Sequence, residues 1–516
     1  MVSIRIHTHI GEHVALEPQP EETLARAIFM CGLWHGVPLC SGLGKCGLCR
    51  VRYVVDVPDH TADEKKKLGE EALASGWRLA CLHPATSCEI ELPEPVRSKR
   101  VTRTLADTTG DFSLAVDLGT TSIHWSALVN DRPVATGQGL NPQTGLGSEV
   151  MSRLAAASTP EGRTILRDLI TNQLAELVQT NVGTLSGACT SLAISGNSVM
   201  TYILLGLKPD DLATAPYTLS YTGGDEQQLT AELPPAYIAP LLAPFVGADL
   251  SAGLTALEYG NTADYPFLLA DLGTNGEFIL AMSPDQRLCA SVPMGPALEG
   301  VGLSFGRTAG PGAITGFTLT PKGLEAHAFD TTATDLTGMT GTGYLSLVAI
   351  LRKHGVLNES GQFDTGSTPL AAKLADKVTT IQGEPAFVIN EALHLPASDI
   401  EEILKVKAAF NLAMSALLNA AGFGPAGLTQ IFIAGALGEY VSLDDLEILG
   451  FLPPGCKTKA TKAGNSSLRG TEILTTDMQA RRFAEALPDT MTRLDLTGDA
   501  GFGDEFIQRM RFAYVD

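Results

Sequence analysis

The chain has 516 residues and a formal net charge of −21, with 44% apolar and 18% charged residues. Its length allows about three domains, and its apolar fraction is that of a globular protein, which excludes a disordered or collagen-like chain. The acidic balance argues against nucleic acid as a partner, because proteins that neutralise phosphate backbones need a basic face.

The first residues, MVSIRIHTHIGEH, alternate apolar and polar side chains as a strand does and lack the basic start and apolar run of a signal peptide. We therefore expect a cytoplasmic protein. A later stretch, 408–438, carries no formal charge and is long enough to span a bilayer. Because GFGPAG interrupts it and Asn411, Ser415 and Asn419 lie within it, the sequence favours a buried helix, a turn and a buried strand, and no membrane partner.

The cysteines are unevenly placed, which does not fit a secreted disulfide scaffold. Near the N-terminus lie Cys31, Cys40, Cys46, Cys49, Cys81 and Cys88, whereas Cys189, Cys289 and Cys456 are isolated. We expect Cys31, Cys88 and the three isolated cysteines to be structural.

Four of these cysteines have the spacing of a metal centre. Cys40, Cys46 and Cys49 have five and two residues between them, and Cys81 follows. Thiolates are soft ligands that suit iron–sulfur clusters or zinc. Structural zinc generally uses two separated C-x2-C pairs or histidines, whereas three ligands share one loop here, and its glycines can turn backbone N–H groups towards sulfur. The pattern favours a [2Fe–2S] cluster over zinc. Ordinary surface or core roles are expected for His7, His9, His13, His35 and His83.

The segments around this loop predict a hairpin over 2–17, a helix over about 20–32 and a strand from Arg50. This order resembles the plant-type and vertebrate-type [2Fe–2S] ferredoxins, which implies a β-grasp fold for 1–95. The basic residues Arg97, Lys99, Arg100 and Arg103 then predict a solvated linker over 96–112, long enough for reorientation.

A second feature occurs twice. The segments SLAVDLGTTSIHWSALVND from 113 and FLLADLGTNGEFILAMSPD from 267 each predict a strand, a tight turn and a strand. Each apolar run brings an aspartate, Asp117 or Asp271, to the strand end, where it can hold the waters around Mg²⁺. Glycine, threonine and successive N–H groups in the turn can bind phosphate oxygens.

Each half also has a strand that ends in a small-residue turn and opens a helix, SLAISGNSVMTYILLGL in the first and QIFIAGALGEYVSL in the second. Helix N-termini favour anionic ligand groups, and a glycine turn lets adenosine lie against the backbone. Together these elements resemble the actin, sugar-kinase and heat-shock ATPase superfamily, whose two ribonuclease-H-like halves bind ATP. This implies halves over 113–259 and 260–516, and so an α/β fold class. Neither a Walker A sequence nor an obvious Rossmann fingerprint is present.

A ferredoxin ahead of such an ATPase resembles the ATP-dependent reductive activators of corrinoid proteins in methyltransferase and O-demethylase systems. Further segments carry the likeness, among them NPQTGLGSEVMSR at 141–153, PMGPALEGVGLSFG at 293–306 and GNSSLRGT at 464–471. Because little sequence separates Glu91 from Ser113, we expect a short form without the extra domain that longer members carry between ferredoxin and ATPase.

The resemblance implies a set of site residues. Cys40, Cys46, Cys49 and Cys81 would hold the [2Fe–2S] cluster, and Asp117 and Asp271 would organise Mg²⁺ and ATP. The phosphates would be bound by Gly119, Thr120, Thr121, Gly273, Thr274, Asn275 and Gly276, the adenosine by Gly435, Ala436 and Gly438, and the ribose by Glu299, for which a cap or surface role is an alternative.

The implied activity is the return of an oxidised Co(II) corrinoid to Co(I), with ATP as the energy source. The implied partners are a corrinoid protein and an upstream low-potential electron donor, and a homodimer is common in the family. Three alternatives stay open: an ATP-driven activator of another low-potential enzyme, a redox-sensing kinase, and an electron carrier without ATP dependence.

Overall fold

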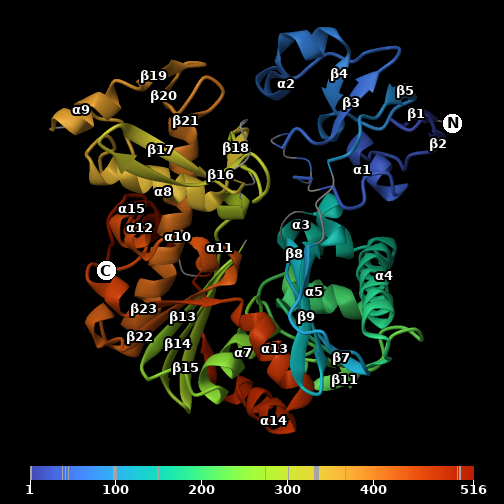
Figure 1. Cartoon of the computed structure of the whole chain (residues 1–516), viewed down its shortest axis with the longest axis vertical. Helices are drawn as coiled ribbons and strands as arrows, with labels where there is room; N and C mark the ends of the chain where they lie inside the picture. Colours follow the sequence, from blue (N-terminus) through green and yellow to red (C-terminus); the bar gives the residue numbers. More distant parts are fainter. Residues whose placement is uncertain are drawn as a thin grey trace. The chain divides into compact units, whose positions relative to one another are not determined.

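The computed structural model describes residues 3–37, 39–40, 42, 44, 46–96, 101–147, 150–273, 275–299, 302–330, 336–365, 368–496, 498 and 501–516 (Figure 1). The chain forms two compact units. The first comprises 1–192, 199–217 and 228–236, and the second comprises 193–198, 218–227 and 237–516.

The N-terminal module of the first unit is built on a five-stranded sheet in the order β2-β1-β5-β3-β4 (Figure 1). Its elements are β1 (Ile4–His7), β2 (His13–Leu16), α1 (Leu24–Met30), β3 (Arg50–Tyr53), α2 (Ala62–Ala74), β4 (Trp77–Leu79) and β5 (Cys88–Glu91). Ile4 and Ile6 are buried while Arg5 between them is exposed, as the alternating sequence predicts. The predicted hairpin, helix and strand are thereby confirmed.

The predicted basic linker over 96–112 is wrong in one part. Residues Val101–Thr104 form β6, which pairs antiparallel with β9 (Arg132–Leu140). The sequence V-T-R-T contains three β-branched residues, which suit an extended edge strand even when all four side chains are exposed. Arg103 therefore lies in a sheet, whereas Arg97, Lys99 and Arg100 lie outside the described residues.

The first unit continues with the first predicted strand, turn and strand, β7 (Phe112–Leu118) and β8 (Ser122–Val129), which pair antiparallel. Within a seven-stranded sheet β7, β8 and β9 lie side by side in chain order, β6 lies at the edge beyond β9, and β10 (Cys189–Gly196) flanks β7. The helices are α3 (Val150–Ala157), α4 (Pro160–Leu185), α5 (Ser198–Leu205) and α6 (Asp210–Ala213). The predicted strand and helix around Gly196 are confirmed as β10 and α5.

The second unit repeats this arrangement in a six-stranded sheet, β23-β22-β13-β14-β15-β24. Its strands are β13 (Phe267–Leu272), β14 (Asn275–Ser283), β15 (Gln286–Pro293), β22 (Gln430–Ala434), β23 (Ala460–Gly464) and β24 (Met491–Arg493). β13, β14 and β15 are antiparallel neighbours, and β22 runs parallel to β13. The antiparallel triplet beside a strand that opens a helix occurs in both halves, as the duplicated sequence predicts.

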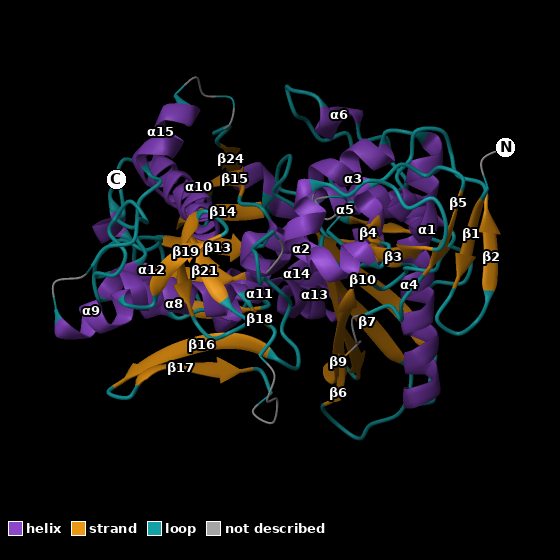
Figure 2. Cartoon of the chain, turned by 90° about the horizontal axis from the view of Figure 1, so that it is seen from above, coloured by secondary structure: helices purple, strands orange, loops and turns teal. Residues whose placement is uncertain are grey.

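Two smaller sheets accompany the six-stranded one. They contain β16 (Ala313–Thr320), which pairs antiparallel with β17 (Gly323–Ala328) and lies beside β18 (Gly338–Met339), and the strands β19 (Val378–Ile381), β20 (Glu384–Val388) and β21 (His394–Pro396) (Figures 1 and 2). The helices of this unit are α7 (Ala248–Leu254), α8 (Gly341–Lys353), α9 (Pro369–Ala375), α10 (Ala397–Ala421), α11 (Gly435–Tyr440), α12 (Leu443–Ile448), α13 (Ser466–Thr476), α14 (Met478–Ala486) and α15 (Phe502–Gln508).

The uncharged stretch 408–438 contains the end of α10, a turn at Pro425–Gly427 and strand β22. Among the described helices, α10 is the one with the length and composition to cross a membrane, and 78% of its most apolar window is buried inside the protein. Phe410, Met414 and Leu417 pack into the core of this unit. The prediction of a buried helix, a turn and a buried strand is confirmed.

Candidate functional site

The four predicted cluster cysteines come together in the N-terminal module. Cys40 and Cys46 lie on the loop after α1, Cys49 directly precedes β3, and Cys81 lies in the turn between β4 and β5. Cys40, Cys49 and Cys81 are buried and Cys46 is half-buried. All four line one cavity of about 170 Å³. The sequence spacing therefore predicts the shared location correctly.

Within this cavity the thiols form two pairs. Cys49 donates a hydrogen bond to Cys81 with 3.3 Å between the sulfurs, and Cys46 is hydrogen-bonded to Cys40. Among the described residues, no group of three or more His, Cys, Asp or Glu side chains is arranged around a single metal ion. A structural zinc site would need four ligands around one ion. Two pairs of thiols fit the two irons of a four-cysteine [2Fe–2S] cluster better.

The thiols of each pair compete for ionisation. The bond to Cys81, together with burial, raises the pKa of Cys49, and the same bond lowers the pKa of Cys81. The bond to Cys40, followed by burial, raises the pKa of Cys46. In each pair, ionisation of one sulfur thus disfavours ionisation of the other. Bound iron would supply the positive charge that lets all four be thiolates.

The backbone of the ligand loop also fits a cluster. Gly42, Gly44 and Gly47 have φ of 98°, 69° and 73°, a region that residues with side chains rarely adopt. Two N–H groups of the loop point at sulfur, because Gly44 donates to Cys81, and Leu48 donates to Cys46 Sγ over 3.4 Å. This geometry agrees with the prediction that the loop glycines let backbone N–H groups face the sulfur atoms.

The turn that carries Cys81 rests on a buried carboxylate that the sequence analysis missed. Glu64 is fully buried at the start of α2. Its Oε1 accepts a hydrogen bond from the Leu79 N–H over 2.7 Å and lies 2.8 Å from His83 Nε2. Although burial opposes ionisation, the N–H groups of Thr61 and Leu79 and the His83 ring lower the pKa of Glu64. The capping pattern T-x-x-E at 61–64 is the signal that predicts its position.

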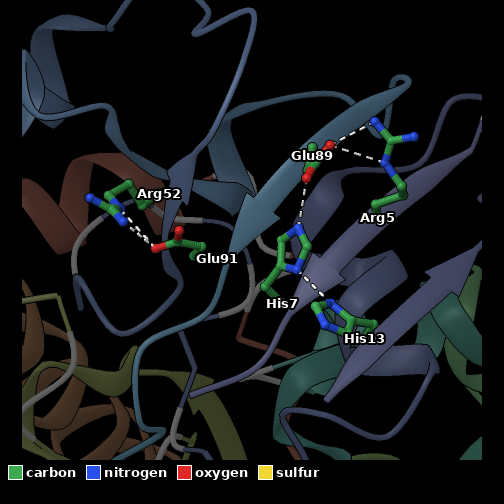
Figure 3. A network of polar contacts seen from close by, with 6 residues as sticks. All are labelled: Arg5, His7, His13, Arg52, Glu89 and Glu91. Carbon is green, nitrogen blue, oxygen red and sulfur yellow. Dashed lines mark hydrogen bonds and ion pairs between the residues drawn. The ribbon is translucent and has the colours of Figure 1, made fainter. Parts of the chain in front are cut away.

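Two other histidines of this module, His7 and His13, have partners that do not line the cluster cavity. His7 Nε2 lies 2.8 Å from Glu89 Oε1, and His7 Nδ1 lies 2.6 Å from His13 Nδ1 (Figure 3). Arg5 also binds Glu89, and Arg52 binds Glu91 on the same strand (Figure 3). These contacts tie β1, β2, β3 and β5 together. They fit the prediction that His7, His13 and His83 are ordinary surface or core residues.

The first predicted phosphate-binding turn lies between β7 and β8. Asp117 is near the end of β7, opposite His124 of β8. Gly119 leaves no room for a side chain, because a Cβ there would be 2.6 Å from the Ser122 carbonyl oxygen. Thr120 is buried and Thr121 is partly buried. The turn is thus tight enough to present successive backbone groups to an anion.

The second turn, between β13 and β14, gathers more of the predicted residues. Asp271 pairs in register with Ala434 of β22, and Gly435 follows immediately with φ of 85°. A Cβ on Gly435 would lie 2.6 Å from Asp271 Oδ1, so the predicted carboxylate and adenosine-binding glycine are neighbours. Gly273 is linked to Asn275 by a backbone hydrogen bond of 3.1 Å. Gly276 pairs with Leu272 across the hairpin, and Gly438 packs on Ile433.

For three predicted site residues the structure gives no side-chain description. Thr274 lies outside the described residues, and the side chains of Glu299 and Ala436 are not described. One further acidic residue, Glu277, lies opposite Asp271 in the β13–β14 pairing and is 5% exposed. A charged residue directly after D-L-G-T-N-G, at the head of an apolar strand, is the signal that the sequence analysis passed over.

Comparison with known families matches nearly the whole chain in three consecutive regions. A model of the 2Fe-2S iron-sulfur cluster binding domain matches residues 8–86. The RACo middle region matches 112–261, and the C-terminal domain of RACo, the ASKHA domain, matches 266–516. The ASKHA fold is that of actin, sugar kinases and heat-shock ATPases, so the predicted α/β fold class is confirmed.

Two curated relatives are named for corrinoid chemistry. The corrinoid activation enzyme RamQ of Eubacterium limosum is 27% identical over 437 residues, which cover 78% of this chain and 70% of the relative. The [Co(II) methylated amine-specific corrinoid protein] reductase of Methanosarcina barkeri is 26% identical over 253 residues, which cover 45% of this chain and 42% of the relative. The matched part is thus less than half of the second relative's length.

A solved structure, a reductive activator for corrinoid, iron-sulfur protein, has the same fold. It covers 99% of both chains with a TM-score of 0.69 and 21% sequence identity. The expected short form without a middle domain is therefore wrong. The middle region is present at 112–261. The middle region begins where the short stretch between Glu91 and Ser113 ends, so the length of that stretch says nothing about its presence. The first hairpin of the middle region is the one that the sequence assigned to the first ATPase half.

Proposed function

We propose that this chain, a reductive activator of the RACo type with ferredoxin, middle and ASKHA regions in that order, reduces the corrinoid of a partner protein from Co(II) to Co(I) in an ATP-dependent, one-electron reaction. The observation that carries the proposal is that one chain holds both a paired-thiol cavity and two strand–turn–strand elements that each carry an aspartate, Asp117 or Asp271. The names of its relatives point to a corrinoid protein as the substrate. That this protein belongs to a methyltransferase or O-demethylase system is carried by the family resemblance alone.

For the cluster, the pairs indicate the ligand sets. Cys40 and Cys46 would hold one iron, and Cys49 and Cys81 would hold the other. When bound, a [2Fe–2S] cluster supplies one-electron chemistry at about −400 mV if it is of the plant type. The chain contributes thiolates, loop N–H groups directed at sulfur, and the Glu64 contact that holds the Cys81 turn.

For ATP, we propose that Asp117 and Asp271 hold the waters around Mg²⁺, which prefers carboxylate and water ligands. The N–H and hydroxyl groups of the two turns would bind the phosphates through Gly119, Thr120, Thr121, Gly273, Thr274, Asn275 and Gly276. The residues proposed for adenosine are Gly435, Ala436 and Gly438, with Glu299 at the ribose. The contact between Gly435 and Asp271 supports a common site for both ends of the nucleotide in the second unit.

ATP is needed because the electron moves uphill. Each 100 mV by which the corrinoid couple lies below the donor costs about 2.3 kcal/mol per electron. ATP offsets this cost only if it binds two states of the chain with different affinity, since equal affinity shifts no equilibrium. The two aspartate turns are the elements of this chain that would distinguish those states.

The test replaces Asp271 by Ala in the full-length protein. ATP-dependent Co(I) formation should be lost while the visible spectrum of the cluster is unchanged. Asp285→Ala is the matched control, because Asp285 is exposed in the turn that follows the opposite end of β14. Retention of full ATP-dependent activity by Asp271→Ala would refute the assignment of this carboxylate.

An upstream low-potential electron donor is also part of the proposal, since the one-electron reaction consumes reductant. A homodimer stays a prediction from the family resemblance, and a cytoplasmic location stays a prediction from the N-terminal sequence. The oligomeric state is tested by measuring the mass of the protein in solution.

A further inference from the structure

The segment 141–153, NPQTGLGSEVMSR, has no role in the proposed function, yet both of its ends bind the first phosphate turn. The Asn141 N–H donates to the Thr121 carbonyl over 2.9 Å, and Asn141 Nδ2 donates to the Gly119 carbonyl over 2.8 Å. Arg153 Nη2 donates to the carbonyl between them, that of Thr120. Three successive carbonyls of the turn are therefore held by the two ends of one segment, which we name the bridging segment; its described residues are 141–147 and 150–153.

These holding groups are inside the protein. Asn141 and Arg153 are both 0% exposed. A hydrogen bond from a charged, buried donor is stronger than one in water, and its loss leaves a costly unsatisfied group. Arg153 also places a positive charge against the turn that the proposed function assigns to phosphate, because its guanidinium binds the Thr120 carbonyl. An anion bound at that turn would attract the guanidinium and so act directly on the bridging segment.

Other residues of the same segment face the cluster cavity. Gly145, Leu146 and Ser152 line this cavity together with the four cysteines. Gly145 lies directly against α1, because a Cβ there would be 2.0 Å from the Phe29 ring. Neighbouring residues of α1, Thr23 and Arg26, line the cavity as well. The bridging segment thus contributes a wall to the space in which the cysteines meet.

The segment is also cross-linked to itself, so that its ends and its middle move together. Arg153 Nε donates to the Gly147 carbonyl over 2.8 Å, and Arg153 Nη1 lies 3.1 Å from Gln143 Oε1. Ser152 at the cavity and Arg153 at the turn are consecutive residues on α3. A shift of α3 that follows Arg153 must therefore displace Ser152 at the cavity wall.

We propose that the bridging segment couples nucleotide binding at Gly119–Thr121 to the environment of the cluster, with Asn141 and Arg153 as positioning residues. The inference rests on the proposed function, because it needs a nucleotide at this turn and a cluster in the cavity. Coupling of this kind is reciprocal. Nucleotide binding should shift the reduction potential of the cluster, and the oxidised and reduced proteins should bind nucleotide with affinities that differ by the same free energy.

The experiment uses the full chain with its cluster and a non-hydrolysable ATP analogue with Mg²⁺. The reduction potential and the electron paramagnetic resonance spectrum of the reduced cluster are measured with and without the analogue. Gly145→Ala forces the segment away from Phe29 without touching the phosphate turn. Arg153→Lys keeps the charge but loses the forked contacts. Gly183→Ala is the control, since a Cβ at this position of α4 meets nothing within 4 Å.

We expect the wild type and Gly183→Ala to show a nucleotide-dependent shift in potential and spectrum. Gly145→Ala should still bind the analogue and keep its cluster, but the shift should be lost, and it should be reduced or lost in Arg153→Lys. A shift that survives in Gly145→Ala overturns the proposal, and so does a wild type without any shift. ATP-dependent Co(I) formation by the wild type is measured on the same preparation, and its failure would count against the proposed function instead.

Discussion

The neighbouring positions of Gly435 and Asp271 lead to a sharp prediction for the variant Gly435→Ala. Gly435 has φ of 85°, and its Cβ would lie 2.6 Å from Asp271 Oδ1 and 2.7 Å from the Leu272 carbonyl oxygen. Ordinary contacts of a Cβ begin near 3.4 Å, so the new methyl group must displace its neighbours by several tenths of an ångström. The Leu272 oxygen belongs to a strand and cannot move aside alone. The displacement therefore falls on the carboxylate that we assign to Mg²⁺-ATP.

Two effects must be separated. The left-handed backbone conformation costs about 1–2 kcal/mol for a residue with a side chain. In a domain of this size that lowers the melting temperature by roughly 2–4 °C per kcal/mol. The clash is a second effect, and it acts on function. A misplacement of about 1 Å can cost about 10²-fold in a catalytic site, so a smaller shift at Asp271 should weaken ATP turnover by about 10-fold or more.

Gly455→Ala is the matched control. Gly455 has φ of 82°, nearly that of Gly435, but a Cβ there meets nothing within 4 Å. Both variants should lose stability in a thermal melt, Gly435→Ala more because its Cβ also meets the Leu272 backbone, whereas only Gly435→Ala should lose ATP affinity by calorimetry and ATPase activity. Equal ATP affinity in the two variants would refute the proximity of Gly435 to the nucleotide site.

Two other outcomes follow from the structure. Cys46→Ala should abolish the visible spectrum of the cluster and leave ATP binding largely intact, and an unchanged spectrum would exclude Cys46 as a ligand. A fully buried lysine, Lys407 on α10, holds the C-terminal residues through Asn411 and the Arg509 and Ala513 carbonyls. Burial, with Arg509 and Arg511 nearby, lowers the pKa of Lys407 from 10.5 to about 7. Between these values the unfolded chain binds one proton more than the native chain, so the Lys407 contribution makes unfolding free energy rise with pH, by up to about 1.4 kcal/mol per unit. Denaturant melts at pH 7 and pH 9 should show this rise in the wild type and not in Lys407→Met, and an equal pH dependence in both would contradict it.

Features that depend on a short stretch of the sequence were predicted well. The spacing of Cys40, Cys46 and Cys49 indicated one ligand loop, and the two D-L-G-T segments indicated two strand–turn–strand elements. Both depend on residues that are close along the chain, where strand alternation and turn chemistry are decisive.

The contacts that support these elements were not predicted. Arg153 lies 33 residues from Thr120, to whose carbonyl it donates, and Glu64 reaches His83 across 19 residues. Strand β6 forms only because β9 offers an edge, which the sequence of 96–112 does not reveal. Such contacts depend on the tertiary arrangement, and no local pattern encodes the partner of a buried arginine or an exposed edge strand.

The reduction of Co(II) itself is the most direct test of the account. The purified protein with its cluster, a reductant and a Co(II) corrinoid protein is monitored for the absorbance of Co(I), first without and then with Mg²⁺-ATP. We predict that Co(I) accumulates only after ATP is added. Full Co(I) formation without ATP, or phosphate transfer to a small acceptor with no change at cobalt, would contradict the proposed function.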